Sequence, residues 1–205
     1  MRILMVMAHP DDEVIFGWPI LQDRKGNNIS LLTLSDNASK HGAGPINALK
    51  EVCKRAGIQL LDFPRKDNNF YRTEPRFEKY ILKDVINLFQ SNVRKAIDIA
   101  KPEIIFTHNP MGEYGHGDHR FVFNLISMFN INLMFTDICF ANGCHLSSGK
   151  VPGIYLKHFF GKLVGQHHIL NLSWYNRMKR IYERHGAWSW SGHPPITDCK
   201  LYSFM

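Results

Sequence analysis

The chain has 205 residues, of which 44% are hydrophobic and 21% charged, and these are the proportions of a folded globular protein. They exclude a disordered chain and a fibrous repeat, and the length allows a single α/β domain over residues 1–205. Twenty-five Lys and Arg against eighteen Asp and Glu give a net charge of +7, which favours anionic ligands without naming one.

Apolar runs alternate with helical patterns from the start of the chain. The unbroken apolar run at 3–8 predicts a strand buried on both faces of a parallel sheet, and 29–34 predicts its neighbour. A helix predicted over 13–24 joins them into one βαβ unit. The same patterns predict helices over 48–56, 76–100 and 116–128 and strands at 60–63, 104–107 and 133–140. This alternation predicts a doubly wound, mostly parallel, Rossmann-like α/β sheet flanked by helices.

The last third of the chain is less regular. It predicts a strand at 168–172 and a helix at 174–184, and apolar residues at helical spacing over 156–164 predict a helix that covers the core or lies on a membrane surface. The apolar run at 3–8 is too short for a signal core or a spanning helix, and the four cysteines form no CxxC pair. We therefore expect a cytoplasmic protein with reduced thiols, without a transmembrane segment.

Two clusters of histidines and carboxylates follow predicted strands. His9, Asp11, Asp12 and Glu13 come directly after the first strand, where open α/β sheets bind their ligands. The residues suit either a metal site with an adjacent base or an acidic helix N-terminus. For Glu13 we expect the second role, that of an acid that favours the start of the helix electrostatically.

The second cluster, at 112–119, follows the predicted strand at 104–107, so the two clusters should meet at the same edge of the sheet. His116 and His119 are three residues apart, a spacing that places both on one face where the helix has begun. Such a pair suits a metal ligand beside a catalytic imidazole. For His108, Asn109 and Glu113 we expect loop structure and supporting hydrogen bonds.

These motifs carry a family resemblance. Ala-His-Pro-Asp-Asp-Glu at 8–13 and Gly-His-Gly-Asp-His at 115–119 resemble the AHPDDE and GHxDH motifs of the LmbE-like (PIG-L) zinc-dependent N-acetyl sugar deacetylases. Weaker similarity extends through 51–58 and 182–190. The chain departs from the family at Asn47, where many members carry arginine, and at 33–35, where Thr-Leu-Ser replaces Thr-x-Gly. Both departures lie near the substrate in the family.

The resemblance implies one Zn2+ ion per chain, held by His9, Asp12 and His119, with Asp11 as the general base. Three protein ligands leave a fourth position for water, which is typical of a catalytic zinc site, although another divalent metal is compatible with the same donors. The ion would lower the pKa of its water to about 7, so that even an aspartate serves as the base.

The resemblance also implies the residues around the reacting carbonyl. A protonated His116 is expected to stabilise the oxyanion, Asp118 to orient that imidazole and favour its charged form, and Tyr114 to add a hydroxyl donor.

Residues further along the chain are candidates for substrate binding. His185 lies where family members often supply a substrate-side histidine, but a helix end also commonly carries one. Trp188 and Trp190 suit either stacking on a sugar ring or packing in the core. The basic residues beside the predicted strand ends suit a substrate phosphate or solvated loops: Lys40, Arg65, Lys66 and Arg72.

The sequence thus favours a zinc hydrolase that removes acetyl from an N-acetylated amino sugar of the N-acetylglucosamine type, nucleotide- or lipid-linked. The alternative is a zinc amidase acting on a thiol-sugar or a non-sugar N-acyl conjugate. The positive charge alone would suit a nucleic-acid-binding protein, but no reader motif accompanies it, so we expect no nucleic-acid partner. Peripheral contact with a membrane remains open.

Overall fold

The computed structural model of the protein describes residues 1–22, 24, 26–66, 79–138, 140–141, 144–145, 162–163, 168–190 and 197–204. The strands of the main sheet are β1 (Arg2–Met7), β2 (Asn28–Thr33), β3 (Gln59–Leu60), β4 (Ile104–Thr107), β5 (Leu133–Thr136), β8 (Lys162–Leu163) and β11 (Leu201–Phe204). Two short ladders pair β6 (Phe140–Ala141) with β7 (Cys144–His145) and β9 (His168–Ile169) with β10 (Asp198–Cys199). The helices are α1 (Asp12–Ile15), α2 (Trp18–Leu21), α3 (Ala38–His41), α4 (Gly44–Ala56), α5 (Lys79–Ala100), α6 (Gly112–Gly115), α7 (Gly117–Ile126) and α9 (Leu172–Arg184).

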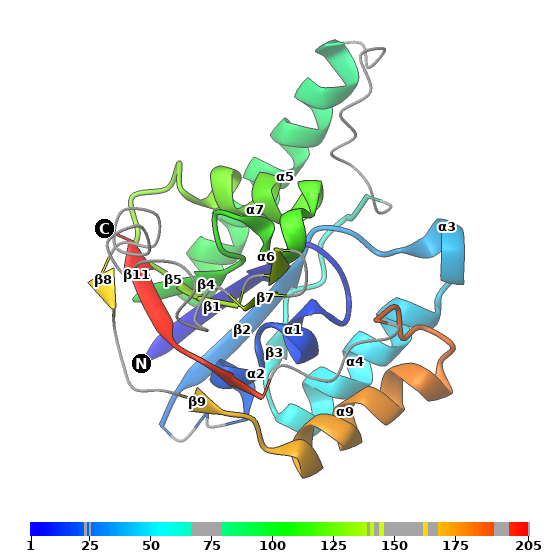
Figure 1. The fold of residues 1–205 in the computed structure, drawn as a ribbon. Helices are drawn as coiled ribbons and strands as arrows, with labels where there is room; N and C mark the ends of the chain where they lie inside the picture. Colours follow the sequence, from blue (N-terminus) through cyan, green and yellow to red (C-terminus); the bar gives the residue numbers. More distant parts are fainter. Residues whose placement is uncertain are drawn as a thin grey trace.

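The main sheet has seven strands in the order β3-β2-β1-β4-β5-β11-β8 (Figure 1). The strands from β3 to β5 are parallel, whereas β11 runs antiparallel to both β5 and β8. The predicted doubly wound, mostly parallel α/β sheet is confirmed. The antiparallel edge was not predicted, because a short run at the chain's end carries no signal of the strand it will pair with.

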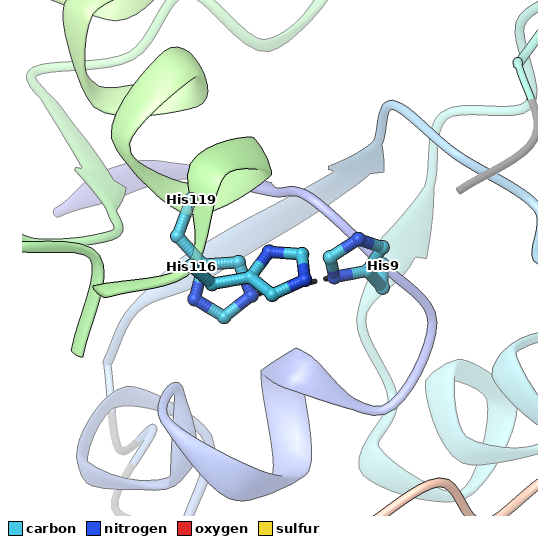
Figure 2. A group of neighbouring side chains, drawn as sticks. All are labelled: His9, His116 and His119. Atoms are coloured by element: carbon cyan, nitrogen blue, oxygen red, sulfur yellow. Dashed lines mark hydrogen bonds between the residues drawn. The ribbon is translucent and has the colours of Figure 1, made fainter. Parts of the chain in front are cut away.

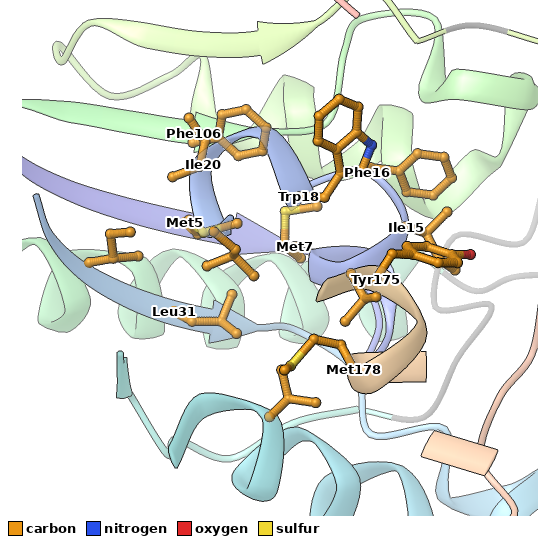
Figure 3. Close-up of a cluster of buried hydrophobic side chains, with 14 of the residues drawn as sticks. Met5, Met7, Ile15, Phe16, Trp18, Ile20, Leu31, Phe106, Tyr175 and Met178 are labelled. Atoms are coloured by element: carbon orange, nitrogen blue, oxygen red, sulfur yellow. The ribbon is translucent and has the colours of Figure 1, made fainter. Parts of the chain in front are cut away.

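Strand β1 contributes to two separate cores because its alternate residues point to opposite faces of the sheet. Met5 and Met7 pack with side chains of α1, α2, α4 and α9, some of them drawn in Figure 3. Leu4 and Val6 pack with side chains of α5 and α7 on the other face. The strand is therefore buried on both sides, as its unbroken apolar run predicts.

The single helix predicted over 13–24 is in fact two short helices, α1 and α2, that meet at Gly17. A Cβ atom at Gly17 would lie 2.7 Å from the carbonyl oxygen of Glu13, so glycine is needed for this close turn. The break directs Trp18 into the core, where it is fully buried.

Other boundaries differ modestly from the predictions. The strands at 60–63, 133–140 and 168–172 are shorter, and the last two helices begin or end within two residues of the expected positions. The helix predicted over 156–164 is wrong at Lys162 and Leu163, which form β8, and the rest of that segment lies outside the described residues. Helix α5 is described from Lys79. No helix of the described residues is long and apolar enough to cross a bilayer.

Candidate metal centre

The two predicted clusters lie side by side at the carboxyl end of the sheet. Strands β1 and β4 are hydrogen-bonded neighbours, and the chain leaves each of them directly into one cluster. In Figure 2, His9 reaches in from the loop after β1, and His116 and His119 reach in from the start of α7. This is the edge at which an open α/β sheet binds ligands, where its strand order reverses.

Three donor atoms from the clusters converge on one point. His9 Nδ1 lies 3.1 Å from Asp12 Oδ2 and 3.3 Å from His119 Nε2, and the latter two atoms are 3.5 Å apart. Tetrahedral zinc with ligands at about 2.0–2.1 Å requires donors about 3.3–3.4 Å from one another. The mixed nitrogen and oxygen donors and their spacing therefore fit the metal that the resemblance implies.

Two further histidines lie within reach of the same donors. His116 groups with His9 and His119, and His108 groups with Asp12 and His119, each set having ligand atoms within 4.8 Å of one another. His108 Nε2, however, accepts a hydrogen bond of 2.9 Å from the backbone N–H of Ala8. Its lone pair is thus already used, which removes His108 from the ligand set.

In His9 and His119, the ring nitrogen that points away from the proposed ion faces a carboxylate. His9 Nε2 lies 2.9 Å from Asp118 Oδ2, and His119 Nδ1 lies 2.7 Å from Glu113 Oε2. The prediction that Asp118 orients His116 is therefore wrong in the structure. His116 Nδ1 is buried and has no hydrogen-bond partner among the residues that the structure describes.

His116 also differs in charge from the expectation. It precedes the first turn of α7 with an extended backbone (φ −64°, ψ 129°), and its ring centroid lies 4.7 Å from that of His119 and 5.0 Å from that of His9. Burial, followed by the charges of His119 and His9, lowers the pKa of His116 to about 4. His116 is thus neutral at pH 7, and the expected imidazolium is not favoured.

Asp11 occupies a strained position just ahead of α1. Its backbone has φ 94°, a conformation that non-glycine residues rarely adopt, and its N–H lies 3.0 Å from Glu13 Oε2 and 2.9 Å from the Tyr182 hydroxyl. Its carboxylate accepts hydrogen bonds from the Ser189 hydroxyl (2.6 Å) and N–H (3.2 Å). Burial and the charge of Asp12 raise the pKa of Asp11 to about 7, against the lowering effect of Ser189.

Glu13 lies in the first turn of α1, as predicted, but not on a solvated helix end. It is 0% exposed, and its Oε1 accepts a 2.7 Å hydrogen bond from the Tyr182 hydroxyl. Burial raises the pKa of Glu13 to about 8, although the Tyr182 hydrogen bond opposes the shift. Glu13 therefore holds the Asp11 loop through its hydrogen bonds to the Asp11 N–H and the Tyr182 hydroxyl. Because its pKa is raised to about 8, it carries little of the negative charge at pH 7 that the expected helix-dipole role needs.

Aromatic rings border the histidines on one side. Tyr114 is 42% exposed and stacks on Phe16, and Trp190 contacts both, with ring centroids 5.8 Å from Phe16 and 5.5 Å from Tyr114. Trp188 instead contacts Tyr175 and Tyr182, which belong to α9. Of the two candidate tryptophans, Trp190 is the one beside the histidine cluster.

The contacts recorded for the remaining substrate candidates are with residues outside the cluster. His185 Nε2 is paired with Glu51 of α4 at 3.2 Å, and Lys40 lies exposed in the last turn of α3. The Arg65 side chain is 7% exposed, and it donates to Asp62 (2.6 Å) and Thr33 (3.0 Å).

The backbone of Lys66 bridges to Ser35, and Arg72 lies outside the described residues. Within the described residues, Arg65 Nε and Nη1 are used to hold Thr33 and Asp62, whereas Nη2 is buried and has no hydrogen-bond partner.

Sequence patterns did not point to two residues that the structure brings to the site. Tyr182 and Ser189 lie about 170 residues from Asp11, in the region whose topology was least legible. His108 and Glu113, by contrast, make the supporting hydrogen bonds expected of them, and both are at most 1% exposed. No spacing rule connects Tyr182 or Ser189 with Asp11, because these partners are set by tertiary contacts.

The profile of the PIG-L family, described as GlcNAc-PI de-N-acetylase, matches residues 4–129, more than half of the chain and both motifs. The chain belongs to the PIG-L family.

Two kinds of relatives accompany this family match. An uncharacterized protein, L374, of Acanthamoeba polyphaga mimivirus is 28% identical over 142 residues, which are 65% of this chain and 60% of that protein. Among solved structures, a zinc-inhibited form of the teicoplanin deacetylase Orf2 superposes with a TM-score of 0.65 at 12% identity, covering 99% of this chain and 97% of the other. The A40926 pseudoaglycone deacetylase Dbv21 gives a TM-score of 0.58 at 14% identity, covering 91% and 81%. At these identities the structures establish a shared fold.

Proposed function

We propose that this PIG-L family protein is a zinc-dependent deacetylase that hydrolyses the acetamide of an N-acetylated amino sugar to acetate and a free amine. The observation that carries the proposal is the convergence of His9 Nδ1, Asp12 Oδ2 and His119 Nε2 within 3.5 Å of one another, beside the buried carboxylate of Asp11. These three residues would hold the zinc. The ion supplies Lewis acidity and makes water acidic enough to ionise near neutral pH.

Asp11 is the proposed general base. It accepts a proton from the attacking water and passes it to the departing amine, so that amide and water yield acetate and amine with no other reactant. Burial and the charge of Asp12 raise the pKa of Asp11 to about 7, which makes it a stronger base than an ordinary aspartate. Ser189 holds one carboxylate oxygen through its hydroxyl and its N–H, which leaves the other oxygen for the proton.

His116 and Tyr114 are proposed to bind the carbonyl oxygen as negative charge develops on it. Because the pKa of His116 is lowered to about 4, the imidazole acts as a neutral hydrogen-bond donor and not as an imidazolium. Tyr114 lies beside it, with ring centroids 5.4 Å apart, and its partial exposure leaves room for a substrate.

The proposed substrate is a sugar of the N-acetylglucosamine type. The half-exposed Tyr114 and Trp190 adjoin the histidines and offer apolar faces on which a sugar ring can pack, and the buried Phe16 packs against both. The family is described as GlcNAc-PI de-N-acetylase, and the structural neighbours are named as a teicoplanin deacetylase and an A40926 pseudoaglycone deacetylase. The GlcNAc in the family description supports the same sugar class here.

The test is release of primary amine from free, nucleotide-linked, inositol-linked and thiol-conjugated N-acetylhexosamines and from a non-sugar N-acetyl amide. We expect release from a sugar in the panel, lost with chelator and restored by zinc. Asp11→Asn should bind zinc and lose most turnover, whereas His119→Ala should lose zinc, with the exposed-site variant Glu183→Gln as the matched control. Release only from the non-sugar amide would refute the sugar class, and release unaffected by chelator would refute the zinc mechanism.

A further inference from the structure

The buried carboxylate of Glu113 bridges the Nδ1 atoms of two stacked histidines. Its Oε2 lies 2.7 Å from His119 Nδ1 and 3.1 Å from His108 Nδ1, and the two imidazole rings stack with centroids 3.8 Å apart and 18° between planes. Its other oxygen, Oε1, accepts the backbone N–H of Asn109 at 3.0 Å. Glu113 is 1% exposed, so water contributes little to satisfying this carboxylate.

The directions of these hydrogen bonds determine which nitrogen of each ring carries hydrogen. His108 Nε2 accepts from the Ala8 N–H, so His108 donates to Glu113 through Nδ1. A carboxylate accepts hydrogen bonds, so His119 also donates through Nδ1, and its Nε2 lone pair is left facing His9 and Asp12. The nitrogen that faces the proposed ion is therefore selected by the residue behind the ring.

The backbone of Glu113 is held in an unfavourable conformation to reach this place. Its φ of 55° and ψ of −70° lie outside the regions that non-glycine residues normally adopt. The side chain of Asn109 braces the turn by accepting the Glu113 N–H at 3.2 Å. A turn with no role for the carboxylate would be better served by glycine at this position.

We propose that Glu113 is a positioning residue of the metal centre, which holds His119 as its Nδ1–H form with Nε2 directed at the ion, and that His108 buttresses the pair. This inference rests on the proposed function, because it requires that His119 bind a metal. A hydrogen-bonded carboxylate behind a ligating histidine fixes its orientation and makes it a stronger donor, and loss of such a partner weakens metal affinity 10–100-fold.

The experiment measures zinc affinity of the full chain by competition with a chromophoric chelator. Glu113→Gln keeps the shape of the side chain but leaves a single oxygen for three donors, so we expect a Kd 10–100-fold above that of the wild type. Glu113→Gly relieves the backbone and should show the same weakening in a folded protein. Glu183→Gln, at an exposed carboxylate paired with Lys179, should bind zinc as the wild type does.

Nitrogen-15 NMR of the zinc-loaded wild-type protein provides a second measurement that depends on no variant. It should show His119 with hydrogen on Nδ1 and metal on Nε2. The proposal is overturned if the opposite arrangement is found, or if folded Glu113→Gln and Glu113→Gly bind zinc as tightly as the wild type. A wild-type protein that binds no zinc would refute the proposed function itself, whereas failure limited to the variants or to the tautomer refutes this inference alone.

Discussion

The hydroxyl of Tyr182 ties α9 to the loop that carries Asp11, and its removal should cost measurable stability. It donates to Glu13 Oε1 at 2.7 Å and accepts the N–H of Asp11 at 2.9 Å, and the residue is 0% exposed. Tyr182→Phe removes this oxygen and leaves the ring in place. No water reaches the vacated position easily, because the side chain is completely covered.

The size of the loss follows from which partners are left without a hydrogen bond. The N–H of Asp11 keeps Glu13 Oε2 as an acceptor at 3.0 Å, so it remains satisfied. Glu13 Oε1 loses the donor that holds it. One buried polar group left unpaired costs about 1–3 kcal/mol, and we expect the free energy of unfolding to fall by that amount.

Denaturant unfolding at equilibrium measures this change, and Tyr175→Phe is the matched control. Tyr175 lies on the same helix and is 4% exposed, and its hydroxyl makes no hydrogen bond within the described residues. Its variant should differ from the wild type by less than about 0.5 kcal/mol. Equal losses in the two variants, or a loss below about 0.5 kcal/mol for Tyr182→Phe, would refute the reasoning.

Three further predictions concern the core, pH and metal. Phe135→Ala, at a 0% exposed position of β5, should lower the free energy of unfolding, measured by denaturant unfolding, by about 3–5 kcal/mol. Its control, Met128→Ala at a 70% exposed position, should lower it by less than about 0.5 kcal/mol. Similar losses in the two variants would contradict the assigned burial. Hydrogen bonds from Arg184 and then His185 lower the pKa of Glu51 to about 2. The stabilising contribution of the Glu51 carboxylate is therefore complete above about pH 4.5 and is lost as the pH falls towards 2. In urea unfolding across this range, the free energy of unfolding of Glu51→Gln should depend less on pH than that of the wild type. Zinc at one hundred times its Kd should raise the free energy of unfolding by about 2.7 kcal/mol, and a calorimetric midpoint that zinc leaves unchanged would count against binding to the folded state.

Local patterns in the sequence were sufficient for the centre of the sheet and for the ends of its strands. The apolar run at 3–8 predicted β1 because a strand covered on both faces has no polar alternation. The first motif follows β1 directly and the second follows β4 after a loop and α6, so the parallel arrangement brings His9 near His119 at one edge of the sheet. These features depend on neighbours in the chain and on strand direction, which a sequence expresses directly.

Other features depend on residues that meet across the fold. The sequence placed Asp118 beside His116 because the two are close in the chain, but in the structure Asp118 faces His9. The charge of His116 could not be predicted either, since its low pKa comes from burial among other imidazoles. Strand β11 pairs with β5 from 65 or more positions away, which no local pattern specifies.

The surroundings of Asp11 show most clearly which features come from the sequence and which from the tertiary structure. The sequence by itself determined that an aspartate follows a buried strand in a metal-site motif. The tertiary structure decided its surroundings, because α9 returns from the far end of the chain to place Tyr182 on its N–H and leads into Ser189 on its carboxylate. A motif specifies residue types at fixed spacing, whereas burial and hydrogen-bond partners are properties of the packed fold.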